Sequence, residues 1–252
     1  TEIPLRLVGS EMCIRDRVRT ILTEKDPAWV VMHNDLHWTP DGKAFTWTSE
    51  RDGWEQLYRV SRDGATTTKI TTDDFDIDLL HVDHSGLWAY FLASPKDPSQ
   101  RYLYRIGLDG QGMSRLTPES EHRGTHSYRI SPSGKFAVWI RSDADTPSVT
   151  RLVSLPEHTI IKTLEDNAEL HTKIKALKLP PVEFFEVEIE EGIRLPARCI
   201  HPPNIDRSRK YPLLVYVYGE PARQVVRDSW GGLWHHMLAQ PVSYTHLRAH
   251  ET

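Results

Sequence analysis

Residues 35–60, DLHWTPDGKAFTWTSERDGWEQLYRV, contain the unit from which the fold of this chain can be predicted. The turn dipeptide Asp41-Gly42 precedes a run of strand-forming residues, AFTWTS (44–49), and a second run, LYRV (57–60), follows it. Glycine and aspartate permit a tight reversal of the chain, whereas β-branched and aromatic residues are typical of strands. The segment therefore predicts two short strands joined by a loop.

The same unit recurs twice further along the chain. Ser85-Gly86 precedes LWAYFLAS and Ser133-Gly134 precedes FAVWIRS, so the turn glycines follow one another at steps of 44 and 48 residues. A second strand follows in each unit, and a short closing strand completes the first two, at 69–71 and 115–117. Short strands that recur with a period of roughly 40–50 residues are typical of a β-propeller, in which each repeat is one four-stranded blade. A sandwich or a barrel needs no recurring unit, so we predict a mainly β fold that begins with a partial propeller of about three blades.

Aromatic residues of the first unit supply apolar area for contacts between neighbouring blades, and we predict a structural role for them. They are Trp38, Phe45, Trp47 and Trp54. Because three blades cannot close a ring, the open edges of the sheets predict poor solubility for the chain alone.

The strand pattern gives way to a helix and a hairpin after residue 164. Asp166-Asn167 suits the start of a helix, and apolar residues then recur at helical spacing up to Pro180. Residues 184–202 follow as a hairpin with its turn at Glu191-Gly192. Nearer the C-terminus, SWGGLWHHMLAQ (229–240) carries an apolar stripe, which predicts a helix that packs on a sheet.

A different kind of strand is predicted by KYPLLVYVYGEP (210–221). An apolar run ends at Tyr218, and a Gly-Glu-Pro turn follows, which is typical of a buried strand that leads into a sharp loop. Ligands collect at the carboxyl ends of strands in open α/β sheets, and a phenol there can donate a hydrogen bond. This is the one stretch where the sequence indicates chemistry.

This strand and turn, together with residues 35–60 and LEDNAEL (164–170), resemble the dipeptidyl peptidase IV-like branch of the prolyl oligopeptidase family. In that branch the segment usually reads Tyr-Pro-Leu-Leu-Val, a spacer, then Tyr-Gly-Gly-Pro, so Glu220 departs from the pattern and leaves the shape of the loop open. The resemblance implies that Tyr218 is a catalytic residue whose hydroxyl donates to the oxyanion. It also implies propeller blades at 18–165, followed at 166–240 by a connector and the truncated start of an α/β-hydrolase domain.

The resemblance implies equally which catalytic groups are missing. No G-x-S-x-G nucleophile elbow occurs in the sequence, and the family places its Ser, Asp and His beyond the matching part, so the chain as given should be inactive. The family's carboxylate pair for the substrate ammonium group lies upstream of these blades. Glu190-Glu191 sits on the hairpin turn, and we predict that it is a solvated pair rather than a substitute.

Both ends of the chain look like translated sequencing-adaptor sequence, LVGSEMCIRDR (7–17) and PVSYTHLRAHET (241–252). We therefore set residues 1–17 and 241–252 aside as non-native, and do not take Ser243 or His246 as catalytic. On this interpretation the chain is an internal part of a longer protein.

Composition narrows the remaining function classes. The 252 residues carry 31 Lys and Arg against 35 Asp and Glu without charge blocks, which argues against a nucleic-acid or anionic-membrane surface. No apolar run is long enough to span a bilayer. Cys13 and Cys199 cannot form a disulfide framework, and His81-x-x-His84 has no third ligand near it in sequence, so we expect no metal and no other cofactor. Of His235-His236 on the predicted helix, at most one can face a site.

By resemblance, the expected function is removal of N-terminal dipeptides, with proline or alanine second, by a serine-type peptidase. Its partners would be peptide substrates, with a homodimer possible for the full-length enzyme and a periplasmic or secreted location favoured. Two alternatives stay open: a TolB-like propeller that binds without catalysis, and a hydrolase of the acylaminoacyl-peptidase type.

Overall fold

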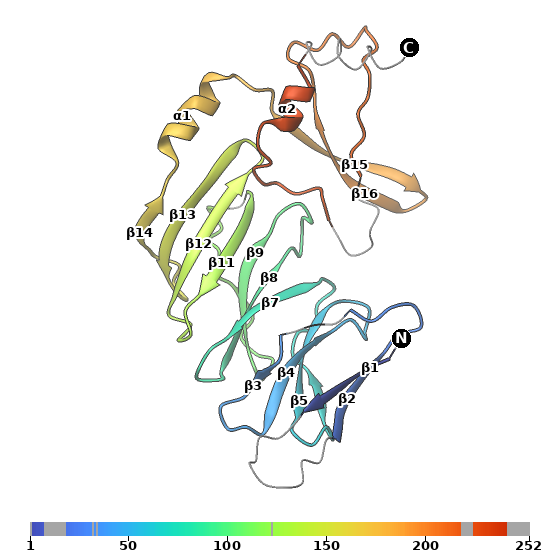
Figure 1. The fold of residues 1–252 in the computed structure, drawn as a ribbon, viewed down its shortest axis with the longest axis vertical. Helices are drawn as coiled ribbons and strands as arrows, with labels where there is room; N and C mark the ends of the chain where they lie inside the picture. The colour runs from blue at the N-terminus through green and yellow to red at the C-terminus, as the bar shows by residue number, and fades with distance from the viewer. Residues whose placement is uncertain are drawn as a thin grey trace.

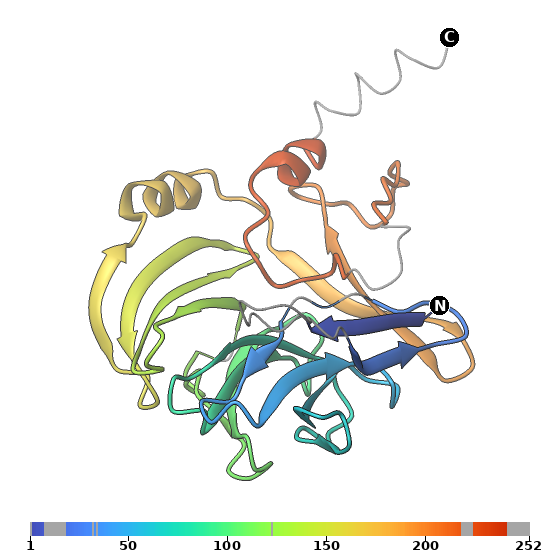
Figure 2. The same ribbon diagram turned by 60° about the horizontal axis from the view of Figure 1, so that its bottom comes forward.

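Three four-stranded antiparallel sheets dominate the computed structural model, which describes residues 2–7, 19–31, 33, 35–121, 123–217 and 224–240. Each sheet takes its strands in chain order, as the propeller prediction requires, and Figures 1 and 2 show the sheets following one another along an arc. Blade one comprises β3 (His37–Trp38), β4 (Ala44–Ser49), β5 (Gln56–Ser61) and β6 (Thr67–Lys69). Blade two comprises β7 (Ile77–Val82), β8 (Trp88–Ala93), β9 (Tyr102–Gly107) and β10 (Ser114–Arg115). Blade three comprises β11 (Thr125–Ile130), β12 (Phe136–Asp143), β13 (Thr146–Ser154) and β14 (Ile160–Glu165).

The turn before the second strand of each blade has the same geometry three times. Gly42, Gly86 and Gly134 have φ values of 64°, 65° and 68°, in the left-handed region that glycine adopts without steric cost. Each of these glycines donates its backbone N–H to the carbonyl of the residue three positions earlier, at 2.8–2.9 Å. The recurring glycine therefore sets the turn that aligns the first two strands of every blade, and the predicted repeat is confirmed.

The core lies between successive sheets, because side chains on a strand alternate between its two faces. On β8, Phe91 points toward blade one and packs with Leu57, whereas Tyr90 belongs to the cluster shared with blade three. In that second cluster Leu103 and Trp139 are almost fully buried. A blade cannot bury both of its faces alone, so each sheet depends on its neighbours.

Of the four aromatic residues predicted to pack between neighbouring blades, two are buried, but they pack with residues 21–22 and 36 rather than with blade two. Phe45 and Trp47 are buried in the cluster of blade one, but Trp38 is 38% and Trp54 is 42% exposed. Trp38 lies edge-on to Phe45, with the guanidinium of Arg62 over its ring. Trp54 lines a cleft described below, so neither Trp38 nor Trp54 lies in the core between blades.

A separate hairpin at the N-terminal side covers blade one. β1 (Glu2–Leu7) pairs with β2 (Arg19–Lys25), and Ile21 and Leu22 of β2 pack on the cluster around Phe45. The backbone of residues 2–7, within the segment set aside from the sequence, thus forms a strand here.

The connector after blade three has the predicted helix and hairpin. Helix α1 (Ala168–Ala176) begins after Asp166, whose carboxylate accepts a 2.9 Å hydrogen bond from the N–H of Ala168. β15 (Val182–Glu190) and β16 (Ile193–Ile200) form the hairpin, with Gly192 in its turn at φ 80°. Helix α2 (Trp234–Leu238) is shorter than predicted, and it buries His236 while Trp234 is 62% exposed.

The buried strand predicted within 210–221 is not formed in the described part of that segment. Residues 211–217 have no regular secondary structure, and Leu213 and Val217 are 81% and 76% exposed. An extended segment becomes a buried strand only when neighbouring strands take up its backbone hydrogen bonds. Among the described strands none pairs with it, so the apolar run lies open.

Candidate functional site

The predicted oxyanion residue cannot be placed, because Tyr218 and Glu220 lie outside the described residues. The described chain resumes at Gln224. Residues 224–240 then return to the propeller and form one wall of a cleft with it. This cleft is the candidate site that the described part of the chain offers.

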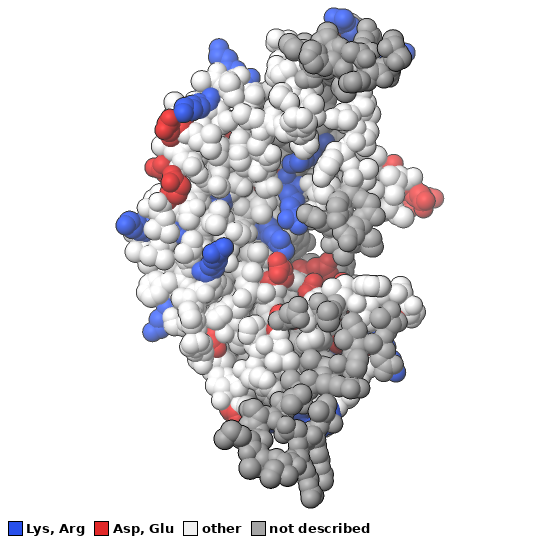
Figure 3. Space-filling model, in the orientation of Figure 1, with Lys and Arg blue, Asp and Glu red and all other residues white. Residues whose placement is uncertain are grey.

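The cleft has a volume of about 740 Å³ and lies between blades one and two on one side and residues 224–227 on the other. Its propeller wall is acidic, with Glu55, Asp74, Asp76 and Asp78, whereas Lys96, Arg101 and Arg227 bring positive charge to its lining. Figure 3 shows basic and acidic side chains meeting in the hollow at the middle of this face. A lining that carries both signs of charge suits a polar ligand better than an apolar one.

One acidic residue of this wall is able to exchange a proton near neutral pH. Burial, together with the carboxylates of Asp35, Asp78 and Glu50, raises the pKa of Glu55 to about 7. The Oε1 atom of Glu55 lies 3.4 Å from Nδ1 of His33, and its backbone N–H donates to Asp76 at 2.8 Å.

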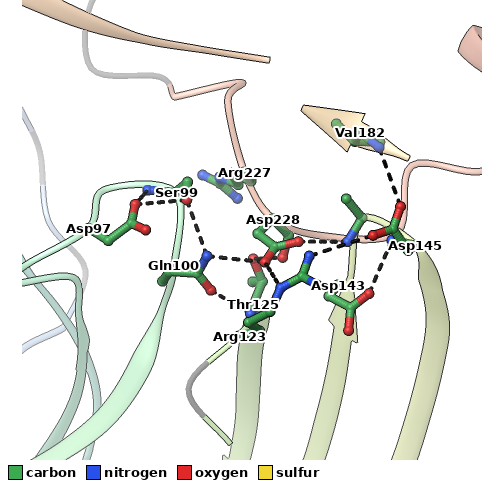
Figure 4. Close-up of polar contacts among 12 residues, drawn as sticks. Asp97, Ser99, Gln100, Arg123, Thr125, Asp143, Asp145, Val182, Arg227 and Asp228 are labelled. Carbon is green, nitrogen blue, oxygen red and sulfur yellow. Dashed lines mark hydrogen bonds and ion pairs between the residues drawn. The ribbon is translucent and has the colours of Figure 1, made fainter. Parts of the chain in front are cut away.

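Asp228 joins the far wall of the cleft to the propeller, and Figure 4 shows its contacts. The Asp228 side chain is only 1% exposed. Its Oδ1 accepts from the N–H of Ala144 at 2.7 Å, and its Oδ2 accepts from the Gln100 amide at 3.1 Å. Its backbone N–H donates to the carbonyl of Ser99 at 2.8 Å, and its carbonyl accepts from the Thr125 hydroxyl at 3.1 Å. We call Asp228 with these four partners the latch. Because a buried carboxylate is costly unless it is hydrogen-bonded, these contacts stabilise one position of the segment.

An ion-pair network surrounds the latch. Arg123 Nε lies 3.5 Å from Oδ2 of Asp228, and its Nη2 lies 3.6 Å from Asp145. Burial works against the charge of Arg123, but the carboxylates of Asp228, Asp143 and Asp145 outweigh it and raise the Arg123 pKa. Asp145 also accepts from the N–H of Val182, at the start of β15, at 3.4 Å. The network therefore connects blade three, the hairpin and the C-terminal segment.

Two further hydrogen bonds extend this attachment on either side of Asp228. The Gln224 side-chain amide donates to the carbonyl of Pro98, and the N–H of Trp230 donates to the Ser142 hydroxyl at 3.3 Å. Residues 224–230 are thus fixed at three points.

A second cavity, of about 510 Å³, borders the same segment on its other side. Arg227 lines both cavities, and its carbonyl accepts from Arg198 of β16 at 3.3 Å. The ring of Tyr216 lies 5.7 Å from that of His235, which also lines this cavity. His236, by contrast, is buried, so of the two neighbouring histidines only His235 faces a cavity.

The remaining residues considered from the sequence lie apart from the cleft. Glu190 and Glu191 are exposed on the hairpin turn. His81 contacts the carbonyl of Pro132 through Nε2 at 3.2 Å, between blades two and three. Cys199 is a half-buried free thiol whose pKa is raised by burial and by Glu183. The sequence candidates outside the described residues, besides Tyr218, are Cys13, Ser243 and His246.

Neither a cluster of metal ligands nor a helix suited to cross a membrane occurs among the described residues. No group of three or more His, Cys, Asp or Glu side chains there is arranged to hold a metal ion. No described helix has the length and apolar character needed to cross a membrane.

The sequence did not reveal the latch. Asp228 stands alone between a valine-rich run and a tryptophan, and its side-chain partners Ala144 and Gln100 are 84 and 128 residues away. No local spacing connects such residues, so only the folded chain could bring them together.

Similar sequences and similar structures among known proteins point to one family. The family model described as dipeptidyl peptidase IV (DPP IV) N-terminal region matches residues 6–148. Dipeptidyl peptidase 4 of Trichophyton rubrum is 27% identical over 186 residues, and that of Arthroderma otae 28%. Each match covers 73% of this chain and 24% of the relative. The crystal structure of Porphyromonas gingivalis dipeptidyl peptidase 4 superposes with a TM-score of 0.77 at 27% identity, covering 88% of this chain and 31% of that one. The chain thus spans about a quarter of the length of these fungal relatives.

Proposed function

Because this chain belongs to the dipeptidyl peptidase IV family, we propose that it is part of a serine-type exopeptidase that releases dipeptides from the N-termini of peptides. The observation that carries the proposal is the family match over residues 6–148, which includes the propeller wall of the cleft. We further propose that proline or alanine is preferred as the second residue, and that the complete enzyme acts as a homodimer.

The chemistry proposed for the complete enzyme is acyl transfer. A serine would attack the scissile carbonyl, a histidine would move the proton, and hydrogen-bond donors would hold the tetrahedral oxyanion. In this proposal Tyr218 is one of those donors. The sequence has no nucleophile elbow, so the chain as given should show no peptidase activity.

The cleft supports this proposal through its position and its charge. Gln224, six residues after Tyr218, and Arg227 form its C-terminal wall, and carboxylates of blades one and two face them. A peptide that binds along the propeller would thus lie against Gln224 and Arg227 as well.

The experiment uses the complete protein that contains this sequence. A fluorophosphonate probe should label one serine in a G-x-S-x-G motif beyond residue 240, and labelling should be absent from the chain as given. Absence of labelling from the complete protein would instead favour a TolB-like binding propeller.

A Tyr218→Phe variant of the complete protein tests the role of the phenol. Removal of one oxyanion donor costs about 3 kcal/mol in the transition state, so kcat should fall on the order of a hundredfold. Tyr216→Phe is the matched control, since it removes a nearby hydroxyl from an exposed side chain. An unchanged kcat in Tyr218→Phe would remove Tyr218 from the catalytic residues.

A further inference from the structure

We propose that Asp228 is a positioning residue, which holds residues 224–230 on blades two and three and thereby sets the C-terminal wall of the cleft. The kinetic part of this inference rests on the proposed function, because it concerns entry of peptides into the cleft. Asp228 itself is not among the residues that line the cleft. It would therefore act through its neighbours Gln224 and Arg227.

Asp228 makes many contacts, and their partners come from two blades. The latch uses the backbone N–H, the carbonyl and both carboxylate oxygens of Asp228. Ser99 and Gln100 precede β9 of blade two, while Thr125 begins β11 and Ala144 lies in the turn after β12 of blade three. One side chain thus connects two blades to the segment, at the rim where the loops of both blades meet (Figure 4).

The side chain of Asp228 is buried. An apolar contact would tolerate small shifts, but a carboxylate that is 1% exposed loses its hydrogen bonds if the segment moves. The carboxylate meets Ala144 and Gln100 of the latch and also Arg123, and a shift of the segment would break these contacts together.

The segment held by Asp228 also contributes side chains to the lining of the cleft. Arg227 directly precedes Asp228 and lines the same cleft as Asp74, Asp76 and Asp78, of which Asp78 is ion-paired with Arg101 at 2.7 Å. A shift of the segment would change both the width of the cleft and its distribution of charge. We therefore expect the latch to affect substrate binding more than the chemical step.

Hydrogen exchange tests the structural part on the chain itself. In Asp228→Ala, the amides of Ala144 and Trp230 should exchange at least about tenfold faster, because the first loses its acceptor and the second loses the restraint on its segment. Amides within β4 and β5 should be unchanged. Asp228→Asn keeps one oxygen as an acceptor but places a second amide donor beside Gln100. In this variant the amides of Ala144 and Trp230 should therefore exchange at rates between those of the unmodified chain and those of Asp228→Ala. Unchanged exchange at Ala144 and Trp230 in Asp228→Ala would overturn the latch.

A matched control separates positioning from general stability. Val153→Ala opens a gap in the core of blade three and touches no residue of the latch. It should lower the melting temperature while Ala144 and Trp230 stay protected. Equal deprotection in Val153→Ala would mean that the segment detaches whenever the propeller is weakened, which contradicts a specific role of Asp228.

Steady-state kinetics test the functional part in the complete protein, with a dipeptidyl p-nitroanilide as the probe. Asp228→Ala should raise KM about tenfold and change kcat less than about threefold, since interactions that act on binding alone appear in KM. Val153→Ala should leave both constants within about threefold below its melting temperature. Unchanged KM in Asp228→Ala would reduce Asp228 to a structural contact. If the unmodified protein releases no dipeptide, the proposed function fails, and the exchange experiment alone decides on the latch.

Discussion

The Oδ1 atom of Asp228 accepts a 2.7 Å hydrogen bond from the backbone N–H of Ala144, a residue that lies 84 positions earlier in the turn after β12. The acceptor belongs to the segment that follows the connector, and the donor belongs to a propeller turn. This bond therefore helps to join the C-terminal segment to the propeller. Because the bond is buried, loss of its acceptor should be costly.

Glu55 should make the protein less stable as the pH rises. Its pKa is raised from 4.5 to about 7 by burial and by neighbouring carboxylates, so the folded state holds its proton where the unfolded state has lost it. Stability is then fully present below about pH 4.5 and is lost as the pH rises through about 7. Glu55→Gln should be more stable than the unmodified chain at pH 8 by about 1–2 kcal/mol, after allowance for solvent screening. Urea unfolding at pH 4 and pH 8 measures this, with Glu191→Gln as an exposed control; an equal gain at both pH values would contradict it.

His126, in contrast to Glu55, should make the protein less stable as the pH falls. Burial, and then the charges of Arg141 and Arg115, lower its pKa to about 3, and its ring Nδ1 accepts from the indole N–H of Trp139 at 3.0 Å. Below about pH 6.5 the His126 ring is protonated in the unfolded state but stays neutral in the folded state. The stability that His126 contributes is therefore fully present above pH 6.5 and decreases as the pH falls toward 3. Thermal unfolding in the Glu55→Gln background, which removes the opposing contribution, should show a melting temperature that decreases steadily from pH 6.5 to pH 4. A constant melting temperature over that range would show that His126 is not held neutral.

The hydroxyl group of Tyr128 should contribute to the free energy of unfolding in addition to the burial of its ring. Its hydroxyl lies between Thr117 Oγ1 at 2.9 Å and Nε2 of His158 at 2.8 Å, in a buried chain of polar groups. Tyr128→Phe leaves Nε2 of His158 without its partner, whereas Thr117 Oγ1 still accepts from the N–H of Leu103 at 2.8 Å. The variant should lower the free energy of unfolding by about 1–3 kcal/mol. Tyr216→Phe, at a side chain that is 65% exposed, should change it by less than about 0.5 kcal/mol. Equal effects in the two variants, measured by urea unfolding, would argue against the buried chain.

Two glycines with the same backbone conformation test how closely β2 packs on blade one. Gly64 and Gly192 have φ values of 77° and 80°, but a Cβ on Gly64 would overlap the carbonyl oxygen of Ile21, whereas Gly192 has open space. Gly192→Ala should cost about 1–2 kcal/mol for the left-handed conformation alone. Gly64→Ala should cost clearly more, because the backbone of β2 must move. Similar losses in chemical denaturation would mean that β2 does not lie against Gly64.

The repeating part of the fold could be predicted from sequence because its signals are local. Gly42, Gly86 and Gly134 lie at the same position of each unit, and every second strand follows its turn directly. The aromatic residues were harder to assign. Trp38, Trp47 and Trp54 are the same residue type in the same repeat unit, so the sequence does not distinguish them. Whether each is buried depends on which other part of the chain packs against it, and the local sequence does not determine that.

The C-terminal part shows where local reasoning ends. Residues 211–217 have the apolar pattern of a buried strand, but a strand also needs neighbours, and no described strand lies beside them. The latch fails to appear in sequence for a related reason, since the three residues Asp228, Ala144 and Gln100 are distant along the chain. The Tyr218 assignment remains a prediction carried by family resemblance alone.

The most direct test of the account compares two substrates with the complete protein that contains this sequence. Glycyl-prolyl p-nitroanilide offers a free N-terminal ammonium group, and its N-acetylated form removes that charge while it keeps the scissile bond. We predict release of p-nitroaniline from the free substrate and a loss of at least about a hundredfold in kcat/KM for the blocked one. The reason is that the carboxylate pair implied by the family resemblance would lose the ammonium group that it binds. Equal cleavage of both, or cleavage of the blocked substrate alone, would contradict the account and favour an acylaminoacyl-peptidase activity.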